Sequence, residues 1–378
     1  MDADTRVAAF LSGGLDSSSV VASMALQSTS PVSTFSAGFE EASFNELGYA
    51  SAVATKYNTD HHELVISQCT PELLPKLVRH FGEPFADSSA VPTFLISQLA
   101  AQHVRVVLSG DGGDEMFAGY ETFAEAQRMQ AFDRIPLSLR RAMSAIAEAM
   151  PSGWYGRTYL RVASRRSAVD RYLEHIHVPY FLCKDTLSAR WLLPGEEGMY
   201  TRELNEFLIP GEADVLSQAL YFAATSALVS DMLVKVDRMS MAHGLEVRSP
   251  YLDHELVEMA MAIPNNWKLR EGRGKDIIYR AWGDRFPEVL FHRPKMGFAA
   301  PVPVWFRTSM RDVLYDVLTG PRFLSRGIVS PTFMRRLIVE HDKLHRDHSS
   351  WLWALLMLEL WFESLEGVHE GQGLCRLN

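Results

Sequence analysis

The stretch that decides the fold is SGGLDSS at residues 12–18, between a short apolar run and a segment with helical periodicity. Adjacent glycines permit positive φ and let main-chain N–H groups converge on an anion. The N-terminus of a following helix adds donors and a favourable dipole. Ser12, Ser17 and Ser18 can supply hydroxyl donors, and Asp16 suits a Mg²⁺ ligand that bridges to phosphate. The stretch predicts a phosphate-binding loop.

The same stretch allows a second interpretation, a glycine turn in which Asp16 or Ser17 caps the helix. It is not a Walker A loop, because it lacks the lysine which that motif requires. Both interpretations place a strand before residue 12 and a helix after it.

Residues 1–125 alternate strand-like and helix-like patterns. The strand-like segments are 7–11, 31–37, 61–66 and 104–109, and the helical ones are 17–26, 46–57, 73–81 and 91–102. This alternation is typical of a parallel sheet with right-handed crossovers. Strand signals fade after Tyr120. We therefore predict an α/β fold, with a nucleotide-binding core at residues 1–125 and a mostly helical region at 126–378 that completes the active site.

Composition excludes several classes of protein. The 378-residue chain carries a net charge of −9, which disfavours non-specific nucleic-acid binding. Its three cysteines lie far apart with no histidine at metal-ligand spacing, which excludes a disulfide framework and a zinc site of that kind. The apolar run at 351–362 is shorter than the ~20 residues of a membrane span and predicts a buried helix. The acidic N-terminus does not resemble a signal peptide. We expect a cytoplasmic protein that binds neither nucleic acid nor membrane.

A second acidic motif, SGDGGDE at residues 109–115, follows the fourth predicted strand. Its residues should lie at the C-terminal edge of the sheet, where open α/β folds bind ligands. Asp111, Asp114 and Glu115 concentrate negative charge there. Capping of a helix that begins near Glu115 is the alternative interpretation.

Three further segments join these two motifs in a fixed order. They are LVKVDRMSMAHGLEVRSPYLD at 233–253, Gly274-Lys275, and RPKMGF at 293–298; the second motif continues to residue 120 as SGDGGDEMFAGY. Together they resemble the synthetase domain of the asparagine synthetase B family, which includes β-lactam synthetases and lasso-peptide cyclases. The resemblance covers residues 7 to 307. It implies the PP-loop ATP pyrophosphatase fold, with ATP cleaved between its α and β phosphates.

The resemblance also assigns ligands. It implies Asp16 and Asp114 as the two Mg²⁺ ligands, and two carboxylates together with substrate phosphates are a usual Mg²⁺ environment. It implies that ATP or pyrophosphate contacts Leu11, Ser12, Gly13, Gly14, Asp16, Ser17, Ser18, Ser36, Gly110, Lys275 and Lys295.

Three catalytic residues follow from the same resemblance. Lys295 would neutralise the phosphate and the developing oxyanion. Glu246 would accept a proton from the attacking amine. Its neighbours in sequence are apolar and a turn follows, so a carboxylate without a functional role would be energetically costly there. Arg248 would orient the Glu246 carboxylate and keep it ionised. Asp111 stands where a β-lactam synthetase has the tyrosine of its catalytic dyad, which favours the asparagine-synthetase side of the family.

Two segments have less specific signals. Residues 83–92 resemble the family's acceptor-pocket segment, with helix capping as the alternative for Asp87 or Ser88. The implied substrate-binding residues are Asp87, Ser88, Ser89, Asp111 and Arg248. In the 233–253 segment, an alternative interpretation is that Lys235, Asp237 and Arg238 form only a surface ion-pair group.

We therefore expect an ATP-dependent amide-forming ligase. A small-molecule carboxylate would be adenylated, with AMP and pyrophosphate as products, and transferred to ammonia or an amine. The chain begins at the first synthetase strand and has no cysteine near residue 1, so we expect no glutaminase activity of its own. Free ammonia, a separate glutaminase subunit and a substrate amine remain open as nitrogen sources. The alternatives are an intramolecular β-lactam or macrolactam ligase and a nucleotide-binding subunit of an amidotransferase, and the chain could form a homodimer.

Overall fold

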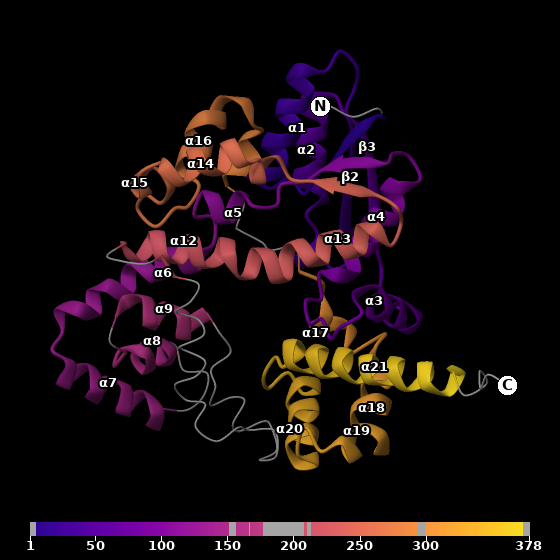
Figure 1. Cartoon of the computed structure of the whole chain (residues 1–378), viewed down its shortest axis with the longest axis vertical. Helices are drawn as coiled ribbons and strands as arrows, with labels where there is room; N and C mark the ends of the chain where they lie inside the picture. Colours follow the sequence, from indigo (N-terminus) through magenta and orange to yellow (C-terminus); the bar gives the residue numbers. More distant parts are fainter. Residues whose placement is uncertain are drawn as a thin grey trace. The chain divides into compact units, whose positions relative to one another are not determined.

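The computed structural model describes residues 5–150, 156–165, 167–176, 208–209, 213–292 and 299–372. The chain divides into two units (Figure 1). The sheet unit comprises residues 1–110, 231–250 and 284–378, and the helical unit comprises 111–230 and 251–283. These units do not follow the predicted boundary at residue 125, because the chain returns twice to the sheet unit.

The sheet unit contains five parallel strands, in the order β3-β2-β1-β4-β5. They are β1 Val7–Phe10, β2 Ser33–Phe39, β3 Asp60–Ile66, β4 Val106–Leu108 and β5 Glu246–Arg248. The predicted α/β class and the first four strands are confirmed. The fifth strand was not predicted from sequence; its Val247 pairs in register with Val107 of β4.

Helices connect these strands and cover the sheet. They are α1 Leu15–Gln27, α2 Leu47–Tyr57, α3 Leu74–Phe81, α4 Ala90–Ala101 and α13 Leu233–Met241. The chain moves outward from β1 to β3 and then continues on the other side of β1, so right-handed crossovers place α1 and α2 on one face and α4 and α13 on the other. Under α4, Ala8, Phe35 and Val107 of the sheet pack with Ile96 and Leu245 in a buried core.

The C-terminal part of the sheet unit is helical. Its helices are α17 Val302–Trp305, α18 Arg311–Thr319, α19 Pro321–Arg326, α20 Pro331–Asp342 and α21 Ser349–Gln372. The buried helix predicted at 351–362 is confirmed within α21, where Trp353 and Leu356 are buried. Glu359 is also buried, and its carboxylate pairs with Arg326 Nε at 2.5 Å. The pair explains why an acidic residue is tolerated in this helix.

The helical unit confirms the prediction of a largely helical second region. Its helices are α5 Gly113–Met116, α6 Glu121–Met129, α7 Leu137–Ala149, α8 Arg157–Val162, α9 Ala168–Ile176, α12 Val215–Thr225, α14 His254–Ala262, α15 Asn265–Lys268 and α16 Asp276–Trp282. Phe123 of α6, Tyr172 of α9 and Leu216, Leu220 and Phe222 of α12 form its hydrophobic core.

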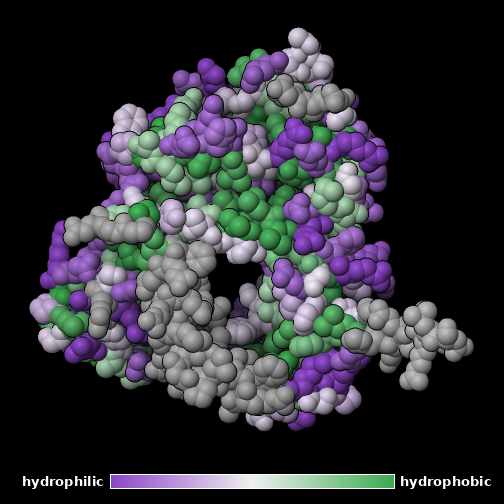
Figure 2. Space-filling model, in the orientation of Figure 1, coloured by the Kyte–Doolittle hydropathy of each residue, from purple (hydrophilic) through white to green (hydrophobic). Residues whose placement is uncertain are grey.

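One helical stretch among the described residues, Val215–Met241, is long and apolar enough to span a membrane, with a mean hydropathy of 1.4 over its most apolar 18 residues. Val229 and Met241 of this stretch are exposed, and Figure 2 shows hydrophobic residues at the surface near the centre of the face in view. A single such helix is weak evidence, because core helices of soluble proteins pass the same test. This one contains a π-helical turn, Leu228–Met232, and the charged residues Asp231 and Lys235, which are costly in lipid. It does not indicate a membrane protein.

Candidate active site

The two glycine-rich motifs lie at the point where the strand order reverses. SGGLDSS follows β1, SGDGGDE follows β4, and β1 and β4 are neighbours. Open α/β sheets bind ligands outside the carboxyl ends of their strands at such a reversal. Gly110 brings the two motifs together, since a Cβ there would lie 2.8 Å from the main-chain nitrogen of Ser17 and 2.9 Å from Cβ of Asp16. The geometry supports a single ligand-binding edge.

Gly13 meets two separate demands for glycine. Its φ is +71°, a conformation that L-residues with a side chain adopt at a cost. A Cβ on Gly13 would also lie 2.6 Å from the main-chain nitrogen of Ala50, in α2. The turn therefore needs both the glycine backbone and the absence of a side chain.

Serine hydroxyls fix the shape of the loop. Ser12 Oγ accepts a hydrogen bond from the Gly14 N–H at 3.2 Å and lies 3.1 Å from Ser17 Oγ. Ser17 Oγ donates to the Gly14 carbonyl at 3.3 Å. Gly14, rather than Asp16 or Ser17, is the N-cap residue of α1. The alternative in which Asp16 or Ser17 caps the helix is therefore wrong, and the phosphate-loop interpretation fits the geometry.

Two other predicted nucleotide contacts, Ser18 and Ser36, are buried. Ser36 Oγ donates to the carbonyl of Leu11. Ser18 is fully buried, and its main-chain N–H donates to the Gly14 carbonyl at 3.0 Å. Contact of Leu11, Ser18 and Ser36 with ATP stays a prediction.

β5 carries Glu246 and Arg248 two residues apart, so both side chains lie on one face of the strand. Arg248 Nε donates to Glu246 Oε1 at 2.6 Å, as expected for an orienting partner. The expected apolar surroundings of Glu246 are wrong: β5 is an edge strand, and the Glu246 side chain is 54% exposed. Water can therefore provide many of the hydrogen bonds that this carboxylate accepts. Its catalytic role stays a prediction.

In the helical unit, the predicted metal ligand and a predicted phosphate contact pair with each other. Lys275 Nζ lies 2.6 Å from Asp114 Oδ1, and Lys275 is buried. Gly119 makes room for the pair, because a Cβ there would lie 1.8 Å from Asp114 Oδ1. Lys275 itself has a φ of +56° as the N-cap of α16. The close packing holds the carboxylate and the ammonium in place.

The same motif contains a buried acid with a local role. Tyr120 Oη donates to Glu115 Oε1 at 2.6 Å, and Glu115 is 2% exposed. Burial raises the pKa of the Glu115 carboxyl, and the neighbouring Asp114 and Asp111 raise it further against the hydrogen bond from Tyr120. Gly112, with a φ of +86°, is the N-cap of α5. Asp111 is half-buried.

The acceptor-pocket segment ends in a network around Asp87. Its Oδ1 accepts from the Ser89 main-chain N–H and hydroxyl, each at 2.8 Å, and its Oδ2 accepts from Lys235 Nζ at 2.6 Å. Lys235 is 6% exposed, so the surface ion-pair interpretation is wrong for this residue, although Asp237 and Arg238 are exposed. Sequence reasoning missed this pair. The available signal was spacing, since Lys235 lies four residues before the buried Met239 on one helix face.

Lys295 and the RPKMGF segment at 293–298 lie outside the described residues, so the roles predicted for Lys295 stay predictions. Within the described ranges, no group of three or more His, Cys, Asp or Glu side chains could hold a metal ion. The predicted Mg²⁺ ligands are only two carboxylates, Asp16 and Asp114, with phosphate oxygens expected to complete the shell. Carboxylate oxygens are ligands that Mg²⁺ accepts, so these residue types fit the ion.

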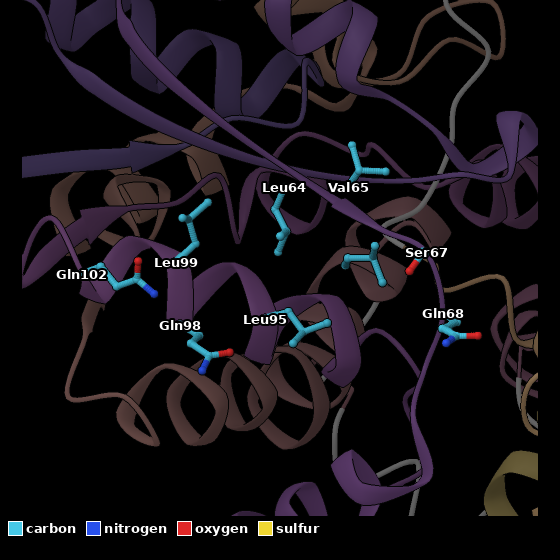
Figure 3. A pocket seen from close by; sticks show the side chains of 9 residues that line it. Leu64, Val65, Ser67, Gln68, Leu95, Gln98, Leu99 and Gln102 are labelled. Atoms are coloured by element: carbon cyan, nitrogen blue, oxygen red, sulfur yellow. The ribbon is translucent and has the colours of Figure 1, made fainter.

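A pocket of about 290 Å³ lies elsewhere in the sheet unit, between the edge strand β3 and α4 (Figure 3). Leu64 of β3 and Leu95 and Leu99 of α4 line it, together with the amides of Gln98 and Gln102. None of the predicted site residues within the described part of the chain lines this pocket.

Comparison with known proteins gives a consistent result. The family model described as asparagine synthase matches residues 1–363. Asparagine synthetase (glutamine-hydrolyzing) 1 of Bacillus subtilis (strain 168) is 29% identical over 367 residues, which are 96% of this chain and 56% of the relative. Asparagine synthetase (glutamine-hydrolyzing) 3 of the same strain is 28% identical, over 83% of this chain and 50% of the relative.

A more distant relative is named Amidase chyE, from Penicillium rubens; it is 25% identical over 87% of this chain and 54% of its own length. The chain thus spans about half the length of the curated relatives it matches.

Proposed function

The chain belongs to the asparagine synthase family, and from this premise we propose that it is a C–N ligase that adenylates a small-molecule carboxylate and transfers the acyl group to ammonia or an amine. One observation carries the proposal: SGGLDSS and SGDGGDE flank the reversal of strand order and meet at Gly110. A nucleotide phosphate at this edge would face the N-terminus of α1, where the N-cap residue is Gly14.

The proposed reaction has two displacements. A carboxylate oxygen attacks the α-phosphorus of ATP, the bond to the bridging oxygen breaks, and pyrophosphate leaves. The nitrogen nucleophile then attacks the acyl carbon, AMP leaves with the bonding electrons, and the nitrogen loses a proton. Dividing the condensation in this way replaces one difficult step by two easier ones.

The chain's residues would serve these steps mainly by positioning and by charge stabilisation. The loop and the first turn of α1 would hold the phosphates. Glu246, kept in place by Arg248, would accept the proton released in the second step, and Lys295 would neutralise developing negative charge. Mg²⁺, for which Asp16 and Asp114 are the proposed ligands, would supply charge neutralisation on the phosphates when bound.

The nitrogen source and cellular setting are also proposals. The Bacillus relatives are named as glutamine-hydrolyzing, and this chain matches about half of their length. We propose that the chain takes free ammonia or ammonia from a separate glutaminase subunit, in the cytoplasm. Asp111, at the position where the ring-forming enzymes differ, supports ammonia over an internal amine.

The products of ATP cleavage test the proposal. The purified chain would be incubated with Mg·ATP and a panel of carboxylates that includes L-aspartate, with ammonium chloride, with glutamine, or with neither. We expect AMP and pyrophosphate, with a rate that rises with added ammonium and with pH above 7, because more of the ammonium is then present as NH₃. Asp16→Asn should abolish product formation, whereas Asp237→Asn, at an exposed position of α13, is the matched control. Formation of ADP and orthophosphate would contradict the proposed chemistry.

A further inference from the structure

A buried ion pair joins two separate segments of the sheet unit. Lys235 Nζ lies 2.6 Å from Asp87 Oδ2, and the exposed fractions of the two side chains are 8% and 22%. A buried ammonium is costly unless it is paired and hydrogen-bonded. Replacing a buried ion pair by apolar residues of similar volume often leaves a protein equally stable. A contribution to stability therefore does not by itself explain why this chain has the pair.

The pair lies at the same edge of the sheet as the phosphate loop. Asp87 precedes α4, which leads to β4, and Lys235 is the third residue of α13, which leads to β5. A crossover helix runs from the C-terminal edge of a parallel sheet back to the N-terminal edge. The beginnings of α4 and α13 therefore both lie at the C-terminal edge.

Asp87 also fixes the backbone at the start of α4. Its carboxylate accepts from the main-chain N–H and the hydroxyl of Ser89, in addition to Lys235. Movement of the Lys235 ammonium would therefore disturb the segment at 83–89, which resembles the acceptor pocket. On the other side, α13 continues through Gly244 into β5, which carries Glu246.

A second carboxylate faces the same ammonium. Asp231, on the π-helical turn before α13, has a raised pKa because of burial and the neighbouring Asp87, against the opposing effect of Lys235. Its Oδ1 is buried and has no hydrogen-bond partner among the described residues. Lys235 thus has two carboxylates to balance, and π-helical turns occur frequently at functional sites.

We propose that Lys235 is a positioning residue: through Asp87 it fixes the 83–89 segment relative to β5, and so sets the affinity for the acceptor carboxylate without contacting it. This inference rests on the proposed function for its substrate. The positioning itself can be tested without turnover.

The first test is hydrogen exchange of the full chain, followed by mass spectrometry. Lys235→Met should speed exchange in peptides covering 83–92 by about tenfold, and exchange in α21 should not change. Lys76→Met, at an exposed position of α3, is the matched control and should change neither. Unchanged exchange at 83–92 would overturn the proposal, whether or not the chain cleaves ATP.

The second test separates positioning from simple stabilisation. Lys235→Met leaves Asp87 and Asp231 near each other without their shared cation, whereas the double variant Lys235→Met/Asp87→Asn removes the repulsion between the two carboxylates, so its melting temperature should recover towards the wild-type value. The KM for the acceptor found active in the ATP assay should nevertheless stay about tenfold raised, with the KM for ATP within about twofold of wild type. Recovery of the acceptor KM together with the melting temperature would show a merely structural pair and would overturn the proposal. A wild-type chain that forms no AMP would defeat the proposed function, and the exchange experiment would then decide the positioning alone.

Discussion

The phosphate loop and the acceptor segment lie at one edge of one sheet, but they are held in different ways. Hydrogen bonds in the loop join residues that are two to five positions apart, such as Ser12 and Ser17. The Lys235–Asp87 pair joins residues 148 positions apart, and the hydroxyls of Ser109 and Ser249, 3.0 Å apart, are separated by 140. The hydrogen bonds that shape the loop are therefore local, whereas the acceptor segment is also held by a contact from a distant part of the chain.

The largest effect should come from disrupting the phosphate loop. Gly13→Ala forces a side chain into a left-handed conformation and against the backbone of α2, which should cost more than about 2 kcal/mol of stability and remove ATP cleavage. Chemical denaturation and pyrophosphate release would measure the two effects.

Gly48→Ala is the control, because Gly48 lies within α2 with nothing within 4 Å of its added Cβ. It should stabilise the protein by about 0.5–1 kcal/mol and leave activity unchanged. If Gly13→Ala behaved like Gly48→Ala, the loop would not need its glycine geometry.

An intermediate effect is expected on β5, which carries Glu246. Glu246→Gln removes the proposed proton acceptor, so amine capture should slow by about 10²-fold while single-turnover adenylation changes little. Rapid-quench measurement of AMP formation and amide formation separates the two steps. Glu258→Gln, the same substitution at an exposed position of α14, serves as the control. Equal loss in both steps would refute the base role.

The smallest effect is expected near the Lys235–Asp87 pair, at Asp231. The folded-state pKa of Asp231 is raised, so its ionised form destabilises the fold, and the penalty grows as pH rises through the ordinary and then the folded pKa of the carboxyl. Asp231→Asn should therefore raise the melting temperature at pH 7.5 by roughly 1–2 °C, with a smaller gain at pH 4.5. Scanning calorimetry across that range measures the difference. A gain that does not depend on pH would contradict this explanation.

The same contrast explains which features could be predicted from sequence. The loop, four strands and their helices follow from local patterns, and the α/β class follows from their alternation. β5 is only three residues long, with charges on both sides of Val247, and so lacks the run of apolar residues that marks a buried strand. The burial of Lys235 depends on Asp87, in the segment before α4, and the pairing of Lys275 with Asp114 joins two distant parts of the chain. The spacing from Lys235 to Met239 indicates a buried helix face, but no local pattern identifies the partner of either lysine.

Isotope transfer tests the central claim most directly. The acceptor carboxylate identified in the ATP assay would be labelled with ¹⁸O in both oxygens, and the AMP formed in a full turnover would be examined by mass spectrometry. If the carboxylate attacks the α-phosphorus, one labelled oxygen passes to AMP when the nitrogen nucleophile displaces it, and pyrophosphate stays unlabelled. AMP without label, formed in the same amount as the amide product, would contradict an acyl-adenylate and with it the proposed ligase chemistry.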